Sequence, residues 1–170
     1  EAAPEMDRIV IAVDPPVSAG PQADECGIIV AGRRGNTAYV LEDLSAGGLS
    51  PLDWARRVIA AFHRHCADRV VAEANQGGDM VAAVLRQADD TVPVTLVRAT
   101  RGKRLRAEPV AAIYERGLVR HAGTFPALED QLVSFTGVAG EDSPDRLDAL
   151  VWALTHLMLG PAPHPAIRLI

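Results

Sequence analysis

Four acidic residues stand at the ends of apolar runs, where a chain that builds a buried core seldom places charge. Asp14 closes the run RIVIAVD and Glu73 closes RVVAE, while Asp145 and Asp148 open SPDRLDALVWALTHL. A carboxylate beside buried surface is costly unless something pairs with it. Four carboxylates brought together would also repel one another, so the fold has to supply a counter-charge wherever these ends meet.

The order of the expected elements indicates the fold class. Apolar runs and turn signals predict strands over residues 8–14, 26–31, 38–44, 69–73 and 94–99. Helical spacing and capping residues predict helices over 51–66, 79–88, 104–116, 126–135 and 144–159, and 118–121 is a candidate short strand. Short links make antiparallel neighbours and helical links make parallel ones. We therefore expect an α/β domain of order β-β-β-α-β-α-β-α, with a mixed five-stranded sheet and helices on both faces.

This topology can bring the acids together. If the strands that end at Asp14 and Glu73 are parallel neighbours, their carboxyl ends lie side by side, at the edge where α/β sheets commonly bind ligands. Asp145 and Asp148 are three residues apart and share one helix face. Carboxylates and water suit Mg²⁺ or Mn²⁺, and two such ions can activate a water and stabilise a leaving oxygen. The pattern predicts a metal-dependent phosphoryl-transfer site.

Length and composition bound the remaining possibilities. The 170 residues fit one domain with a full core, and no apolar run reaches the roughly 18 residues of a membrane helix. Residues 1–7 resemble the end of a linker, residues 8–159 form the expected domain, and residues 160–170 form a Pro-rich irregular tail. Cys26 and Cys66 lack disulfide or CxxC spacing, so we expect a cytosolic protein.

A basic run stands out in a chain whose net charge is −5. Its members are Arg98, Arg101, Lys103, Arg104 and Arg106, within nine residues that contain no acid. It is either an ordinary solvated loop or a contact for DNA phosphates, and we assign DNA binding to Arg101, Lys103, Arg104 and Arg106. No aromatic residue interleaves the run, so base stacking is not indicated.

Other polar residues have ordinary explanations. The acids at 24, 25, 89, 90 and 142 look like loop residues, and Asn75 with Gln76 fits a turn into a helix. His63, His65 and Cys66 resemble a zinc fragment but lack a partner pair, which favours a helix surface. His121 and His156 are open candidates for a general base, although two-metal hydrolysis does not require one. Trp54 and Trp152 fit core positions.

Five segments resemble the nuclease domain of the large terminase subunit of tailed phages and gene transfer agents, in the ribonuclease H-like superfamily. They are IAVDPP, VAEANQGGDMV, VRATRGKRLRAEPVAAIYERGLVRHAG, FPALEDQLVSFTG and SPDRLDALVWALTHL, and together they cover most of the chain. The resemblance implies a Mg²⁺- or Mn²⁺-dependent endonuclease that cuts concatemeric double-stranded DNA during packaging. Asp14, Glu73 and Asp148 would be its core metal ligands, with Asp145 as an auxiliary ligand or a group that holds water.

The resemblance also implies partners. These are an N-terminal ATPase motor of the same subunit, a portal and a small terminase subunit, all acting in the host cytoplasm without a membrane. The chain has no G-x-x-x-x-G-K-[ST] loop, so the likeness concerns only the nuclease half.

Two other functions stay open at this point. The ending D-x-x-D-A-L-x-x-A-x-T-H also resembles RuvC-type Holliday-junction resolvases, which would be dimeric and prefer four-way junctions. A non-catalytic docking module of the packaging machine would cut nothing. A nucleotide-binding domain is disfavoured, because Asp14-Pro15-Pro16 occupies the place of a Gly-rich loop after the first strand.

Overall fold

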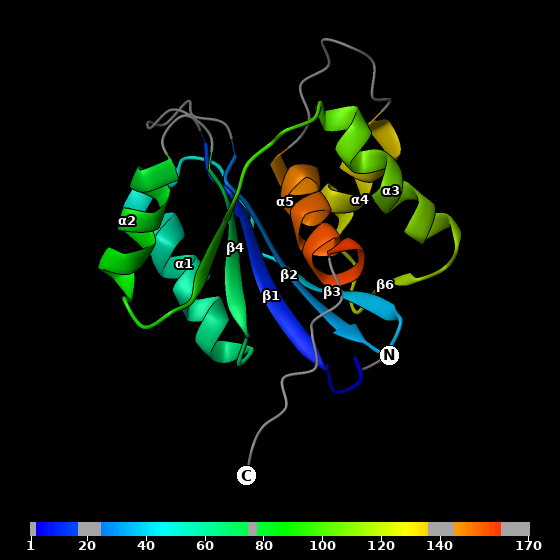
Figure 1. The fold of residues 1–170 in the computed structure, drawn as a ribbon, viewed down its shortest axis with the longest axis horizontal. Coiled ribbons are helices and arrows are strands. Elements are labelled where there is room, and N and C mark those ends of the chain that lie inside the picture. Colours follow the sequence, from blue (N-terminus) through cyan, green and yellow to red (C-terminus); the bar gives the residue numbers. More distant parts are fainter. Residues whose placement is uncertain (1–2, 17–24, 75–77, 136–144, 161–170) are drawn as a thin grey trace.

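A computed structural model of the chain describes residues 3–16, 25–74, 78–135 and 145–160. Its elements alternate in the expected way (Figure 1). The strands are β1 (Arg8–Asp14), β2 (Gly27–Arg34), β3 (Thr37–Asp43), β4 (Arg69–Glu73), β5 (Val94–Val97) and β6 (Val119–His121). The helices are α1 (Pro51–Arg64), α2 (Gly78–Ala88), α3 (Lys103–Glu115), α4 (Pro126–Ser134) and α5 (Asp145–Leu154), and α5 continues into a π-helical turn, η1 (Thr155–Leu159).

The strands form one mixed sheet in the order β5-β4-β1-β2-β3-β6. β1, β2 and β3 pair antiparallel, whereas β1 with β4, β4 with β5, and β3 with β6 pair parallel. The expected α/β class with a mixed sheet is confirmed, but the sheet has six strands instead of five. The candidate strand at 118–121 became the sixth because its three residues pair with β3, a partner distant in sequence.

Helices cover both faces of the sheet, with α1 and α2 on one side and α3, α4 and α5 on the other (Figure 1). Successive strand residues point to opposite faces, so β1 supplies Ile11 and Val13 to the core under α1 and α2. Val10 and Ala12 of the same strand pack against α5. Because both faces are covered, the central strand is apolar at nearly every position, and Asp14 interrupts this pattern only at its end.

Local signals set several boundaries. Ser50 caps α1, since its hydroxyl accepts a hydrogen bond from the Asp53 amide at 3.2 Å, and Pro51 takes the first helical position. Gly35 in the β2–β3 hairpin and Gly117 after α3 have φ values of +56° and +67°, a conformation that favours glycine. Within the described part of the chain, no helix is both long enough and apolar enough to cross a membrane.

Candidate active site

Two acids meet at the carboxyl edge of the sheet. β1 and β4 are parallel neighbours whose register pairs Val13 with Ala72, so Asp14 and Glu73 follow as the next residues of the two strands. Both side chains are buried. This is the adjacency that the sequence required for these strand ends to form one site.

Helix α5 brings the third acid to the same edge. It packs on β2 and β1, and its first turns lie at the carboxyl end of β1 (Figure 1). Asp148 is only 4% exposed although it is an acid, and Asp145 begins the helix. The four predicted acids are close enough for Glu73, Asp148 and Asp145 all to act electrostatically on Asp14.

The electrostatics of Asp14 show how unfavourable this grouping is. The pKa of the Asp14 carboxyl is raised to about 8, first by burial and then by the neighbouring charges of Glu73, Asp148 and Asp145, while Lys103 opposes the rise. A carboxyl in such surroundings resists ionisation until a cation compensates it. Perturbed groups of this kind concentrate at functional sites.

A close backbone approach fixes the start of α5 over the sheet. Gly27 of β2 pairs with Asp14 of β1. A Cβ atom added at Gly27 would lie 2.0 Å from the carbonyl oxygen of Asp145 and 3.1 Å from the Cβ atom of Ala149. Glycine is therefore required here by the packing of the helix rather than by its φ angle.

Helix α3 supplies the positive charge beside the acids. Lys103 Nζ lies 3.1 Å from Asp148 Oδ2, and Arg106 Nη1 lies 3.7 Å from Glu73 Oε2. Burial opposes protonation of Lys103, but its hydrogen bond to Asp148 and the nearby acids together raise its pKa. Lys103 and Arg106 are three residues apart, so one face of α3 places a positive charge beside each of two carboxylates, Asp148 and Glu73.

The basic run is divided by the fold. Arg101 and Arg104 are exposed and Lys103 is half-exposed beside Asp148, as a phosphate contact requires. Arg104 also pairs with Glu108 along the helix at 3.2 Å. Arg106, predicted to share the DNA surface, has only 11% of its side chain exposed and lies against Glu73. Its helical position turns it inward, which the charge run alone does not reveal.

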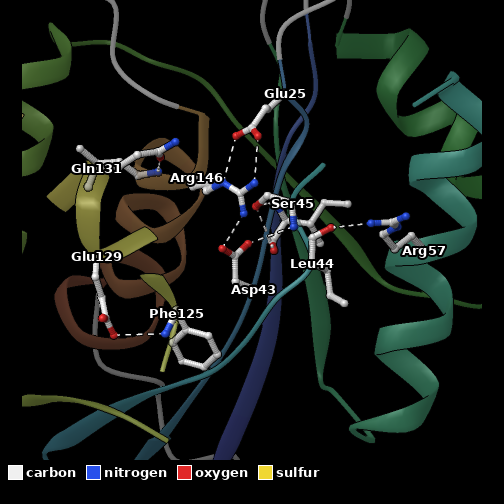
Figure 2. A network of polar contacts seen from close by, with 11 residues as sticks. Glu25, Asp43, Leu44, Ser45, Arg57, Phe125, Glu129, Gln131 and Arg146 are labelled. Carbon is white, nitrogen blue, oxygen red and sulfur yellow. Dashed lines mark hydrogen bonds and ion pairs between the residues drawn. The ribbon is translucent and has the colours of Figure 1, made fainter. Parts of the chain in front are cut away.

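A second ion-pair network holds α5 to the sheet from the side (Figure 2). Arg146 donates two hydrogen bonds of 2.9 Å to the carboxylate of Glu25 and one of 2.8 Å to Asp43 Oδ2. Asp43 in turn accepts from the Ser45 amide, and the Ser45 hydroxyl accepts from the Ile28 amide at 2.9 Å. Bidentate arginine pairs fix geometry as well as charge, so this network sets the position of the helix that carries Asp145 and Asp148.

Sequence analysis missed this network. Glu25 was expected to be a loop acid without a further role. It does lie outside the helices and strands, but it is also the bidentate partner of Arg146. The available signal was an arginine between two site acids in D-R-L-D, since a cation there must either face the site or pair elsewhere. Asp24, Asp142, Asn75 and Gln76 lie outside the described residues.

The histidines lie away from the acids. His63 pairs with Asp89 at 2.8 Å and His65 with Glu42 at 2.8 Å, which fits the expected helix surface. Burial and the nearby charges of Arg8 and Arg69 lower the pKa of His156. Arg8 and Arg69 are the first residues of β1 and β4, so His156 lies at the opposite edge of the sheet. Neither the zinc fragment nor His156 belongs to the site.

His121 is also distant from the acids. Through the sheet register it is level with Val40, Ala31 and Val10, which is four residues before Asp14 on a strand three places away. Its ring contacts Tyr114 Oη at 2.9 Å and Glu129 Oε1 at 3.1 Å. A role as general base for water at the acid edge is therefore not supported.

The donor set fits a divalent cation by chemistry and burial. The carboxylates are buried at this edge of the sheet and the pKa of Asp14 is strongly raised, so a bound cation would stabilise their charged forms. In the part of the chain that the structure describes, however, no three His, Cys, Asp or Glu side chains converge into a ready-made metal cage. Lys103, Arg106 and the indole of Trp152 contact the carboxylates instead. An ion held by Asp148 would therefore have to displace Lys103 from that carboxylate.

Comparisons with known proteins agree with this geometry. A family model described as the terminase RNase H-like domain matches residues 11–157. No curated protein gives a significant match. The large terminase nuclease of thermophilic phage G20c has a TM-score of 0.71 and 18% identity, over 92% of this chain and 86% of that one. Structures of that nuclease include forms with bound zinc and with bound magnesium.

Other solved structures extend the likeness. The large terminase of a second thermophilic bacteriophage has a TM-score of 0.70 and 14% identity over 94% of this chain, which spans only 42% of that protein. The human cytomegalovirus terminase nuclease domain has a TM-score of 0.61 and 14% identity, over 86% and 83% of the two chains, and a manganese-soaked form is known. Thermus thermophilus RuvC has a TM-score of 0.50 and 18% identity, over 87% and 92%. At these identities the structural matches establish the fold.

Proposed function

Because the chain belongs to the terminase RNase H-like domain family, we propose that it is the nuclease domain of a large terminase that cuts concatemeric double-stranded DNA during genome packaging. One observation carries the proposal: three buried acids, Asp14, Glu73 and Asp148, lie near one another at the carboxyl edge of the sheet, where burial and the neighbouring acids raise the pKa of Asp14 to about 8. Such a grouping has no structural benefit to the core, whereas it suits a cation site.

Each acid has a place in the proposed reaction. Asp14, Glu73 and Asp148 would hold the divalent ions, Mg²⁺ or Mn²⁺, with Asp145 as an auxiliary ligand or as a group that orients water. Two bound ions would lower the pKa of a water and stabilise charge on the phosphate that is cut. The bound forms of related nucleases, with magnesium, zinc or manganese, support divalent ions in general.

The exposed cations set the substrate. Arg101, Lys103 and Arg104 stand in the link into α3 and its first turn, beside Asp148. They would neutralise phosphates of a DNA backbone without reading bases, so cleavage is weakly sequence-specific. In a longer subunit, an ATPase motor would deliver the DNA, and the portal and small terminase subunit would be the further partners. The large terminase of the second thermophilic bacteriophage, of which this chain spans 42%, supports a longer subunit.

The test is plasmid cleavage by the purified chain with Mg²⁺, with Mn²⁺ and with EDTA. We expect cutting that needs the metal and is lost in Asp14→Asn and Glu73→Gln, while the matched control Asp90→Asn, at an exposed loop position, cuts like wild type. Cleavage that survives in EDTA, or in Asp14→Asn, would contradict the proposal.

The RuvC-like alternative has its own signature. The fold is shared with T. thermophilus RuvC at a TM-score of 0.50. A resolvase would be a stable dimer and would cut four-way junctions far faster than linear duplex, whereas the proposed nuclease degrades both at similar rates. A docking module would bind partners and cut neither substrate with either metal.

A further inference from the structure

Glu73 is held in place by an unusual buried donor. The indole Nε1 of Trp152 donates a hydrogen bond of 2.6 Å to Glu73 Oε2, and both side chains are buried. Arg106 Nη1 lies 3.7 Å from the same oxygen. Among the described residues, these contacts engage Oε2 alone, so the second oxygen, Oε1, is the one left for a ligand.

Arg106 connects the two groups. Its guanidinium carbon lies 4.8 Å from the centre of the Trp152 ring, in a cation–π contact. Its Nε and Nη1 atoms are buried and make no hydrogen bond with the rest of the described chain. The ring face and the charge of Glu73 therefore both stabilise this largely buried cation, which ties Arg106, Trp152 and Glu73 into one group.

Trp152 is also placed in register with the site. It follows Asp148 by four residues in α5, so the two side chains share one helix face, one turn apart. One helix thereby presents an acid to the carboxyl edge and restrains the acid of a neighbouring strand. The apolar run ALVWAL predicts only a core position for this tryptophan, and its burial satisfies that prediction without explaining a 2.6 Å bond to a site acid.

We propose that Trp152 is a positioning residue for Glu73, which restricts the carboxylate to ligate a divalent ion through Oε1 alone. The inference rests on the proposed metal-dependent function, and it adds a role for a side chain that acts through Glu73. Without the indole donor, the Glu73 carboxylate loses its hydrogen bond to a buried donor and, among the described residues, is held only by the longer contact with Arg106, so metal affinity falls. Groups that orient a metal ligand typically change affinity about 10–100-fold when removed.

The first test compares two identical substitutions. Trp152→Phe keeps an aromatic ring but removes the donor, and Trp54→Phe does the same in the core under α1, on the other face of the sheet. We expect calorimetry to show Mn²⁺ binding about 10–100-fold weaker in Trp152→Phe and unchanged in Trp54→Phe. Cleavage by Trp152→Phe should recover when Mn²⁺ is raised, which damage to the fold would not allow. Equal Mn²⁺ affinity in Trp152→Phe and wild type would overturn the proposal.

The second test does not depend on the folding of Trp152→Phe. The chain has two tryptophans, so Trp54→Phe leaves Trp152 as the single tryptophan, which can be excited without exciting the tyrosines. We expect Mg²⁺ to change its fluorescence with the same midpoint as calorimetric binding, and Glu73→Gln to abolish that change. Mg²⁺ binding that leaves the emission unaltered would overturn the role of Trp152. A wild-type chain that binds neither Mg²⁺ nor Mn²⁺ would instead overturn the proposed function itself.

Discussion

Gly27→Ala tests whether the close contact between β2 and α5 positions the site. The new Cβ atom would lie 2.0 Å from Asp145 O, and real Cβ contacts stay beyond 3.0 Å, so the helix start must move by about 1 Å (3.0 minus 2.0). The atom in the way, Asp145 O, belongs to the backbone, so it cannot move aside by rotating as a side chain could. Asp145 and Asp148 move with it, and a displacement of about 1 Å at reacting groups costs on the order of 100-fold in rate.

The cost to stability follows from the same overlap. Overpacking of this kind destabilises by about 1–3 kcal/mol, which for a chain of this size lowers Tm by roughly 2–12 °C. Differential scanning calorimetry and plasmid cleavage at saturating Mn²⁺ measure the two effects. The matched control is Gly47→Ala, where the nearest atom would be 3.9 Å away and φ is not positive. The reasoning is refuted if Gly27→Ala and Gly47→Ala have the same Tm and the same cleavage rate.

Three further predictions concern charge at and around the site. Arg146→Lys cannot keep the bidentate pair with Glu25, so we expect the free energy of unfolding in urea to fall by about 1–3 kcal/mol and Mn²⁺ binding to weaken. The control Arg86→Lys, at an exposed position, should leave both unchanged. Equal stability of the two variants would contradict the role of Arg146 in holding α5. Lys103→Met removes the cation 3.1 Å from Asp148, so Mn²⁺ affinity measured by calorimetry should rise. DNA affinity at low salt should fall, and the slope of log affinity against log salt concentration should shrink by about 1. Unchanged affinities for both Mn²⁺ and DNA would refute the position of Lys103 between the acids and the DNA. The pKa of Asp14 is about 8 in the folded chain, against an ordinary value of 3.8, so on raising the pH the unfolded chain loses this proton first. In EDTA the free energy of unfolding should therefore decline from about pH 4 to pH 8. The decline should be smaller in Asp14→Asn, and identical pH profiles of the two proteins would count against the raised pKa.

Much of the fold could be predicted because its signals are local. Ser50-Pro51 starts α1, the hairpin turns at Gly35, and apolar strands end at Asp14 and Glu73. The alternation of strands and helices allowed those two strand ends to be parallel neighbours, and the pairing of β1 with β4 in the structure makes them so. β6 was uncertain because three residues carry little strand signal of their own, and only pairing with β3 makes them a strand.

The parts that could not be predicted depend on side-chain direction. The charge run containing Arg106 indicates a basic surface, but helix α3 turns Arg106 onto Trp152 and leaves Arg104 outside. The pairing of Arg146 with Glu25 joins residues that are 121 apart in sequence. Trp152 satisfies a core pattern and a hydrogen bond at once, and a hydropathy pattern reports only the first.

The account depends most directly on divalent ions at the carboxyl edge. Crystals of the chain soaked in Mn²⁺, with data collected at the manganese absorption edge, would locate them by anomalous scattering. We predict two peaks between Asp14, Glu73 and Asp148, with Lys103 displaced from Asp148 and Glu73 bound through Oε1. The assignment of these acids as the metal site would be contradicted by a carboxyl edge of the sheet that holds no manganese at concentrations that support DNA cleavage. Manganese bound only elsewhere on the chain would contradict it as well.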